Sequence, residues 1–384
     1  MILLITPFFP PNIGGVEIHL SDYVDFLKKK KIKTIVLTYQ PITSKIKAPF
    51  REKNGSVEIL RFCYPGHNLF YLLEKRPVFQ FAYLFFGLFI YSFFYLLLNF
   101  KKIEVLHSQG LAAGFVSGVL GKLFRKRTVI SLHTIYRFAD GANITGFSKI
   151  IFSLNNKILA IAKGCKDDLV KVGVDPSKII VYSYWAKTNY FKPLNRDVCR
   201  KKLNLPTDKF ISLFIGRFTP EKQLNEALEV AKLSPEIIFL FVGQGPLGEK
   251  VKTYANKFSN IKLIGRVENK DLPIYDNAAD ILLLGSVDEN YFGKVTMEAM
   301  SCGLPALISD RSYYFGRQKK VDPSVLPSNC GFIVPLDPSK ISEKIKKISG
   351  NMNELKAFRS SCRRFALSNF SEKNAGIILK TCKA

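Results

Sequence analysis

The sequence lacks the side-chain groupings that mark a metal site or a disulfide framework. Its 384 residues include only 4 His and 7 Cys, and no two cysteines form a C-x-x-C pair. Neither a zinc nor a haem signature is present, and no D-x-D pair of acidic residues is found. We therefore expect no metal and no cofactor. An odd number of scattered thiols is typical of a reducing compartment, which predicts a cytoplasmic protein.

Acidic residues are scarce, with 31 Asp+Glu against 57 Lys+Arg and a net charge of +26. Such an excess attracts phosphate-rich partners, which include nucleic acid, anionic lipid and phosphorylated substrates. No RNP, helix-turn-helix or zinc-finger pattern is found, so we predict no nucleic-acid partner. The first residues, MILLITPFFPPN, have no charged region before their apolar stretch. We interpret them as a buried strand and expect no signal peptide.

Apolar strand-like runs alternate with helix-like spacing twice along the chain. The first series lies at 1–5, 33–39, 103–108, 127–133 and 157–162, and the second at 211–217, 237–243, 262–265, 279–286 and 304–309. This alternation predicts parallel sheets covered by helices. We predict an α/β protein with two facing Rossmann-like domains and a cleft between them. The predicted parts are an N-terminal domain (1–188), a C-terminal domain (189–365) and a last helical segment (366–384).

Residues 77–100 form a hydrophobic stretch without a charged side chain. At about 20 residues for a bilayer span, its length allows a transmembrane helix. That interpretation would break the first predicted sheet. The two other interpretations are a buried core helix and a surface helix that faces lipid, with nearby basic residues contacting anionic headgroups. The coincidence with basic clusters at 28–31 and 125–127 favours the membrane-surface helix.

Glycines follow two predicted strands in patterns that suit phosphate binding. Gly14 and Gly15 open a helix after the first strand, where backbone N–H groups can approach a phosphate.

The segment GQGPLG (243–248) matches the dinucleotide-binding pattern G-x-G-x-x-G. However, Pro246 lies inside the turn, and the strand before it is the second of its domain. No strand-ending acid follows about 20 residues later, as dinucleotide binding requires. We reject NAD or FAD binding.

Charged residues at two other predicted strand-to-helix connections could bind a nucleoside diphosphate. Arg217 ends a predicted strand and Lys222 lies five residues later near the start of a helix. Two such cations can neutralise the charge that develops on a diphosphate leaving group. Gly293 precedes a short helix that carries Glu298. A carboxylate there can accept both hydroxyls of a ribose while the helix N-terminus faces phosphate.

Taken together, these segments resemble the retaining glycosyltransferases of family 4, which have the GT-B fold. The resemblance rests on GGVE, GRFTPEK, VGQGPLGEKV, IKLIGRV and ENYFGKVTMEAMSCGLPAL, in the family's order and over nearly the whole chain. It extends to membrane-associated members such as phosphatidylinositol mannosyltransferases. The family uses nucleotide-sugar donors, and most members need no bound metal. It is thought to react by front-face displacement, with the leaving phosphate helping to deprotonate the acceptor.

The resemblance implies that 1–188 is the acceptor-side domain, that 189–365 binds the nucleotide-sugar, and that the helix at 366–384 crosses back to the first domain. It also implies roles for individual residues. His133 would contact the donor sugar, Arg217 and Lys222 would stabilise the departing diphosphate, and Glu289 would be the first acid of the E-x7-E motif. The donor-binding set would comprise Gly14, Gly15, Gly216, Arg266, Val267, Asn290, Phe292, Gly293, Lys294, Val295 and Glu298. His107 is a weaker candidate, while His19 and His67 are interpreted as incidental.

Three departures from the family pattern affect the expected site. In the E-x7-E frame the first acid falls on Asn290, and Glu289 lies one position too early. Either the loop bulges and Glu289 fills the role, or recognition of the donor sugar has changed. Ala162 replaces the usual Ser, and Ser183-Tyr184-Trp185 replaces Pro-Asn-Gly. The last two changes concern the acceptor side more than the nucleotide side.

We therefore expect a hexosyltransferase that uses a UDP- or GDP-sugar and a lipid-linked or other glycan acceptor. It would work peripherally on the anionic inner face of the cell membrane. The alternative is a catalytically degenerate GT-B scaffold that binds nucleotide or membrane. A GT-B epimerase or phosphorylase fits the motifs poorly.

Overall fold

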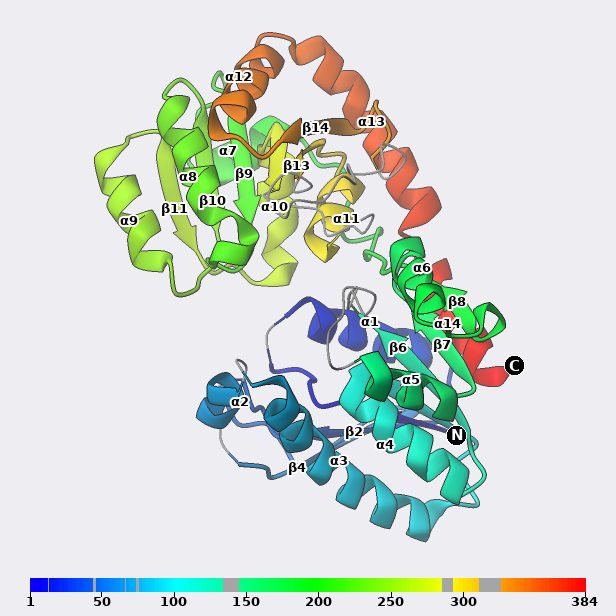
Figure 1. Cartoon of the computed structure of the whole chain (residues 1–384). Helices are drawn as coiled ribbons and strands as arrows, with labels where there is room; N and C mark the ends of the chain where they lie inside the picture. The colour runs from blue at the N-terminus through cyan, green and yellow to red at the C-terminus, as the bar shows by residue number, and fades with distance from the viewer. Residues whose placement is uncertain are drawn as a thin grey trace. The chain divides into compact units, whose positions relative to one another are not determined.

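The structure, a computed structural model, describes residues 1–12, 14–43, 46–65, 67–73, 76–133, 145–284, 293–310 and 326–384 (Figure 1). The chain folds into two compact units, which are described separately below. Unit 1 comprises Met1–Tyr184 and Glu372–Ala384, and unit 2 comprises Trp185–Ser371. The C-terminal helix α14 (Lys373–Lys383) is therefore part of unit 1. The divisions fall a few residues from the expected 188/189 and 365/366.

Unit 1 is built on an eight-stranded sheet in the order β3-β4-β2-β1-β5-β6-β7-β8. The strands are β1 (Ile2–Ile5), β2 (Thr34–Tyr39), β3 (Arg51–Asn54), β4 (Val57–Phe62), β5 (Val105–Gln109), β6 (Arg127–Leu132), β7 (Lys157–Ala160) and β8 (Ile179–Val181). Every pair is parallel except β3–β4. The central strands are buried on both faces, which explains their nearly continuous apolar runs.

Helices connect these parallel strands. They are α1 (Gly15–Lys29), α2 (His67–Leu73), α3 (Pro77–Asn99), α4 (Gly110–Leu123), α5 (Thr145–Leu154), α6 (Lys163–Lys171) and the short 3₁₀ turn η2 (Pro176–Lys178). Figure 1 shows α3 and α4 side by side, and α4 in turn packs on β5 and β6. The core on this side joins Leu3, Leu37, Leu88, Leu106 and Val116.

Helix α3 packs on the unit along one side only. Tyr83, Gly87, Leu88, Ser92 and Leu96 are buried, whereas one row of apolar side chains, which includes Phe86, Ile90, Phe94 and Leu98, is exposed. A Cβ on Gly87 would lie 2.5 Å from the ring of Tyr64, so only glycine permits this close contact. The helix is long and apolar enough to cross a bilayer. Its exposed row shows that it is not an interior core helix of unit 1.

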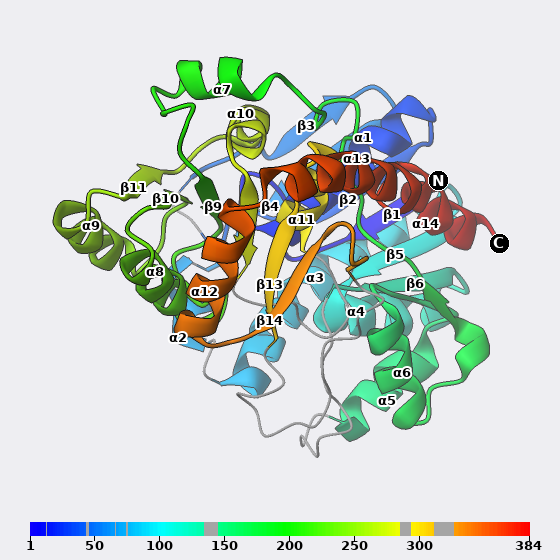
Figure 2. The same ribbon diagram turned by 90° about the horizontal axis from the view of Figure 1, so that it is seen from above.

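Unit 2 has a six-stranded parallel sheet in the order β11-β10-β9-β12-β13-β14. Its strands are β9 (Ile211–Ile215), β10 (Ile238–Val242), β11 (Ile261–Gly265), β12 (Ile281–Leu284), β13 (Ala306–Asp310) and β14 (Gly331–Pro335). Its helices are α7 (Arg196–Lys202), η3 (Pro220–Lys222), α8 (Leu224–Leu233), α9 (Gly248–Lys257), η4 (Asn269–Asp271), α10 (Leu272–Ala278), α11 (Lys294–Ser301), α12 (Pro338–Ser349) and α13 (Met352–Asn369). Figure 2 shows α8 and α9 beside β10 and β11.

A buried ion pair holds α7 against the start of the second sheet. Arg200 is fully buried, and its Nη2 lies 2.7 Å from Oδ2 of Asp280, which precedes β12. Arg200 Nε donates to the carbonyl of Ala278, and Asp280 Oδ2 also accepts the backbone N–H of Ile211 at 2.8 Å. These hydrogen bonds compensate the desolvation of both charges. They fix β9 and β12, which border the candidate site.

Candidate active site

In both units the predicted site residues follow the carboxyl ends of parallel strands. In unit 1, β1 pairs with β2 on one side and β5 on the other, and in unit 2 the order reverses between β9 and β12. Ligands of open α/β sheets bind in the crevice at such a reversal of strand order. The loops after β1, β5 and β6 in unit 1, and after β9, β10 and β11 in unit 2, are therefore the expected binding segments.

His133 belongs to a chain of hydrogen bonds at this edge of unit 1. Its Nε2 lies 2.8 Å from Oε1 of Gln109, the last residue of β5. The amide nitrogen of Gln109 lies 3.1 Å from Nε2 of His107, which also contacts Oγ of Ser131 at 2.8 Å. On its other side His133 Nδ1 lies 2.8 Å from the hydroxyl of Tyr184. His107 and His133 are thus joined through Gln109.

The environment keeps both imidazoles neutral. Burial lowers the pKa of His107 to about 3, helped by the neighbouring His133. Desolvation likewise lowers the pKa of the half-buried His133 below its usual value. One consistent assignment has His133 Nε2–H donating to Gln109, while Nδ1 accepts from Tyr184. The imidazole is therefore held as a neutral, oriented polar group and not as a cation.

Tyr184 explains one of the departures from the family pattern. It occupies the Ser183-Tyr184-Trp185 segment, and besides donating to His133 its buried ring stacks on His19 with centroids 4.0 Å apart. His19 is itself buried and lies 5.7 Å from the ring of His133. The interpretation of His19 as incidental therefore overlooked its place beside the site. The sequence signal was the aromatic pair Tyr182 and Tyr184 directly after a strand.

The glycines that open α1 adjoin an acidic side chain. Gly14 is the N-cap of α1, and a Cβ there would lie 2.3 Å from Oε2 of Glu17 in the first turn. Gly15 has open space around its missing side chain, with nothing within 4 Å. A carboxylate near a helix N-terminus is favourable because it opposes the positive end of the helix dipole. In this structure Glu17 provides the anion at that helix end.

In unit 2 the predicted cation pair lies in the loop after β9. Arg217 and Lys222 are both exposed, and Lys222 ends the short turn η3. The loop is held by Thr219 N–H donating to the Arg217 carbonyl at 3.0 Å and by Lys222 N–H donating to Thr219 at 3.2 Å. Gly216 N–H donates to Val242 at the end of β10. The backbone thus places both cations at the carboxyl edge of the sheet.

The G-x-G-x-x-G segment supports this loop by close backbone packing. A Cβ on Gly243 would lie 1.9 Å from the carbonyl oxygen of Gly216, and one on Gly245 would lie 2.6 Å from that of Phe218. Phe218 N–H donates to Gln244, and Leu247 N–H donates to Phe218. These glycines therefore let the loop after β10 contact the Gly216–Phe218 backbone directly.

Glu298 is buried on α11, where it receives a hydrogen bond from Asn269. The Asn269 amide nitrogen lies 3.2 Å from its Oε1. Asn269 follows Arg266 and Val267, the exposed and half-buried residues that were predicted to border the base. One hydrogen bond therefore joins the predicted ribose acid to the predicted base-binding turn. Asn269, only three residues beyond Arg266, could have been a sequence candidate.

A second buried acid, Asp276, shares the surroundings of Glu298. Burial and the negative charge of Glu298 hold the pKa of Asp276 well above its usual range. In the unfolded chain the same group ionises near its ordinary pKa of about 4. The folded state therefore binds one more proton than the unfolded state, and stability falls as the pH rises above about 4.

Replacing Asp276 with Asn should remove this pH dependence. At pH 8 we expect Asp276→Asn to raise the free energy of unfolding by about 1–3 kcal/mol, because the buried group no longer resists ionisation. The gain should shrink towards pH 4.5. Urea titrations at both pH values would measure it, with the exposed Asp208→Asn as control. Equal pH slopes for the wild type and Asp276→Asn would contradict the assignment.

The remaining predicted donor residues lie around the start of α11. Gly293 is its exposed N-cap, Val295 is half-buried, and the buried ammonium of Lys294 donates to the carbonyl of Trp185 at 2.9 Å. Glu289, Asn290 and Phe292 lie outside the described residues. The choice between Glu289 and Asn290 as the first acid stays a prediction. In the described ranges, no three His, Cys, Asp or Glu side chains gather as metal ligands.

Comparison with known proteins agrees with this architecture. The model for glycosyltransferase family 4 matches residues 13–183, and the model for glycosyl transferases group 1 matches residues 195–365. The phosphatidylinositol N-acetylglucosaminyltransferase GPI3 subunit of Saccharomyces cerevisiae is 22% identical over 378 residues, which cover 90% of this chain and 79% of that protein.

A bacterial relative and a solved structure extend the comparison. The UDP-Gal:alpha-D-GlcNAc-diphosphoundecaprenol alpha-1,3-galactosyltransferase of Escherichia coli is 26% identical, over 56% of this chain and 60% of that protein. The crystal structure of HepE from Anabaena in complex with UDP matches with a TM-score of 0.74 and 16% identity, over 100% of this chain and 99% of the other. The prediction of a GT-B fold is confirmed. The chain is a glycosyltransferase and belongs to glycosyltransferase family 4.

Proposed function

We propose that this protein transfers a hexose from a UDP- or GDP-sugar to a lipid-linked acceptor at a membrane surface, with retention of configuration. The main observation in favour of a nucleotide-sugar donor is the loop that contains Arg217 and Lys222. It presents two exposed cations at the carboxyl edge of β9, and Glu298 is held by Asn269 in the same unit. This combination suits a nucleoside diphosphate, whose phosphates need cations and whose ribose needs a hydrogen-bond acceptor.

In the proposed reaction, the substrates and the side chains of the protein account for every bond and for the transferred proton. The bond between C1 of the sugar and the diphosphate oxygen breaks, while the acceptor oxygen bonds to C1 from the same face. The acceptor proton passes to the departing phosphate oxygen. Arg217 and Lys222 stabilise the negative charge that develops on that phosphate. The neutral, oriented imidazole of His133 offers a polar contact to the sugar hydroxyls and does not compete for the acceptor proton.

Two observations support a lipid-linked acceptor and a membrane surface. The Saccharomyces cerevisiae relative is named for a phosphatidylinositol acceptor and the Escherichia coli relative for a diphosphoundecaprenol acceptor. In this chain α3 exposes a row of large apolar side chains that includes Phe86, Ile90 and Phe94. An apolar helix face with basic residues around it is typical of interfacial membrane binding. The seven cysteines all lie within the described residues and none of them forms a disulfide, which supports the cytoplasmic, inner face of the membrane.

Calorimetric titration of the folded protein with UDP and with GDP tests the donor half. We expect one nucleotide to bind preferentially, with about tenfold or greater loss in Lys222→Ala and in Glu298→Ala, because each loses a charge-assisted contact worth about 1.5–3 kcal/mol. Lys252→Ala, an exposed change on α9, should bind like the wild type. Absence of binding by either nucleotide would favour the degenerate-scaffold alternative.

Sedimentation with lipid vesicles tests the proposal that α3 binds a membrane surface. Replacing Phe86, Ile90 and Phe94 together with Ser should release most of the protein from anionic vesicles, because each exposed side chain loses about 1.5–3 kcal/mol of apolar burial in lipid. The matched control is Leu367→Ser, an exposed apolar residue of unit 2. Unchanged sedimentation of the folded triple variant would remove α3 as the membrane contact.

A further inference from the structure

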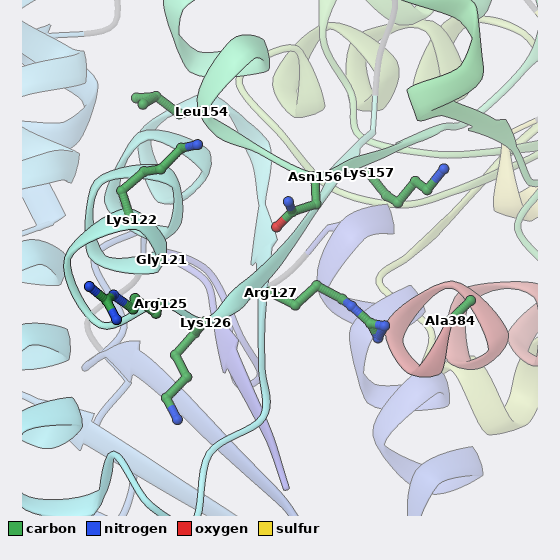
Figure 3. Close-up of a pocket in the computed structure, with 9 residues that line it drawn as sticks. All are labelled: Gly121, Lys122, Arg125, Lys126, Arg127, Leu154, Asn156, Lys157 and Ala384. Atoms are coloured by element: carbon green, nitrogen blue, oxygen red, sulfur yellow. The ribbon is translucent and has the colours of Figure 1, made fainter.

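Unit 1 has a basic pocket at the edge of its sheet opposite His133 (Figure 3). Its volume is about 460 Å³, and Lys122, Arg125, Lys126, Arg127, Asn156 and Lys157 line it. Arg127 begins β6 and Lys157 begins β7, whereas His133 follows the other end of β6. The pocket therefore lies at the amino edge of the strands and shares no residue with the candidate active site. Its volume falls within the range of about 300–1,000 Å³ found for small-ligand pockets.

Close packing and an unusual backbone conformation set the backbone positions of these basic residues. Helix α4 ends at Leu123, and a Cβ on Gly121 would lie 2.2 Å from Cγ2 of Thr128 in β6, so only glycine allows this approach. Arg125 then adopts φ 50°, in the left-handed region that non-glycine residues rarely occupy. This turn places four basic residues, 122 and 125–127, around the pocket, and their side chains point in different directions from its rim (Figure 3). The side chain of Asn156 is held in place because its Oδ1 accepts a hydrogen bond from the backbone N–H of Thr128 at 2.8 Å.

The positive charge of the pocket is poorly compensated. None of its lining side chains is acidic, but Ala384, which carries the terminal carboxylate in this structure, also lines it. Within the described ranges none of its five cations is ion-paired with a carboxylate. Arg127 donates only to the backbone carbonyls of Cys382 and Lys383, at 3.4 and 3.3 Å, and Lys157 to that of Ser177. The pKa of Glu104 is lowered chiefly by the Met1 ammonium and only slightly by Lys126. An anion entering the pocket would relieve the repulsion among these cations.

The pocket borders the exposed face of α3. Lys126 Nζ lies 5.8 Å from the centre of the Phe100 ring, directly beyond the end of α3, and Phe124 contacts Phe93 of that helix. Leu98 and Leu123 are exposed here, at 82% and 61% of their surface. A cationic pocket beside exposed leucines and aromatics is complementary to a molecule with a phosphate head and an apolar tail.

We propose that this pocket binds the phosphate headgroup of an anionic phospholipid, whose acyl chains lie along the exposed end of α3. The inference rests on the membrane placement of the proposed function and adds to it a specific lipid site. This lipid is not the acceptor, because the pocket is at the opposite edge of the sheet from His133. Its role is to hold unit 1 in one orientation on the membrane.

Co-sedimentation at 0.15 M salt tests the proposal, using phosphatidylcholine vesicles with and without phosphatidylglycerol. The pocket variant carries Lys122→Gln, Arg125→Gln and Lys126→Gln. The control variant carries Lys47→Gln, Lys53→Gln and Lys171→Gln, the same charge change on exposed residues of unit 1 that lie outside both basic clusters. We expect the pocket variant to lose about 100-fold in affinity for anionic vesicles, from about 1 kcal/mol per cation. The control should lose at least ten times less.

Each other outcome has a defined meaning. Equal losses in the two variants would show diffuse surface attraction and overturn the pocket. If the wild type bound equally to vesicles with and without phosphatidylglycerol, the anionic-lipid site would also be overturned, whereas membrane contact through α3 would still be supported. Competition by inorganic phosphate as strong as that by short-chain phosphatidylglycerol would identify a free-phosphate site and overturn the lipid assignment. UDP binding should be unchanged in both folded variants, so the donor result is judged separately. Thermal melts verify folding.

Discussion

Lys222→Ala should reduce sugar transfer by about 100- to 1,000-fold in kcat, the cost of removing one donor that stabilises developing negative charge. The residue is exposed at the end of η3, so its side chain contributes no core packing. The loop itself is held by backbone hydrogen bonds that the substitution leaves intact. Folding should therefore be preserved while the leaving diphosphate loses its cation. Release of nucleoside diphosphate from the donor sugar, with and without membrane lipid, measures the rate.

Two variants make this result specific. Lys222→Arg keeps the charge and should retain more activity than Lys222→Ala, although the bulkier guanidinium fits the site differently. Lys252→Ala removes an exposed lysine of the same unit and should turn over like the wild type. If Lys222→Ala turned over at a near-normal rate, the assignment of the Arg217–Lys222 loop to the leaving group would be abandoned.

Asp280→Ala should destabilise unit 2 by about 3–5 kcal/mol, the cost of leaving a buried charge without its partner. Arg200 is fully buried and would keep its guanidinium while losing the carboxylate 2.7 Å away. The Ile211 N–H, at the start of β9, would lose its acceptor as well. Urea unfolding followed by circular dichroism measures the change.

A surface acid provides the comparison for this measurement. Glu236→Ala breaks only an exposed contact of 3.7 Å with Lys346, and such a pair contributes about 0–1 kcal/mol. A loss in Asp280→Ala no larger than that in Glu236→Ala would show that Arg200 is satisfied by backbone carbonyls alone. It would also mean that β9 and β12 are not held together by this pair.

Much of the fold was predictable because central parallel strands are buried on both faces. Their apolar runs, such as those of β1, β6 and β10, stand out in the sequence without any tertiary information. The strands that were missed give weaker signals. All four residues of β3 are exposed, β4 alternates with polar residues, β8 has only three residues, and only two of the five residues of β14 are buried. Their pairing depends on neighbouring strands and not on local composition.

The candidate site divides in the same way. Arg217, Lys222 and Glu298 stand in contiguous motifs, so their spacing along the chain was enough to predict them. The neighbours that set their chemistry come from distant segments. Gln109 reaches His133 across 24 residues, and Asn269 reaches Glu298 across 29. No local pattern contains such a pair.

The sequence by itself determined the family, the two α/β units and the charged residues expected at the nucleotide. Each of these depends on local order along the chain, as apolar periodicity or as a short motif after a strand. Only the tertiary structure decided that His133 is held by Gln109 and Tyr184, that Asp276 is buried beside Glu298, and that basic residues of α4, β6 and β7 line one pocket. Burial and hydrogen-bond partners arise when separate segments pack together, and they set the charge state and orientation of each side chain.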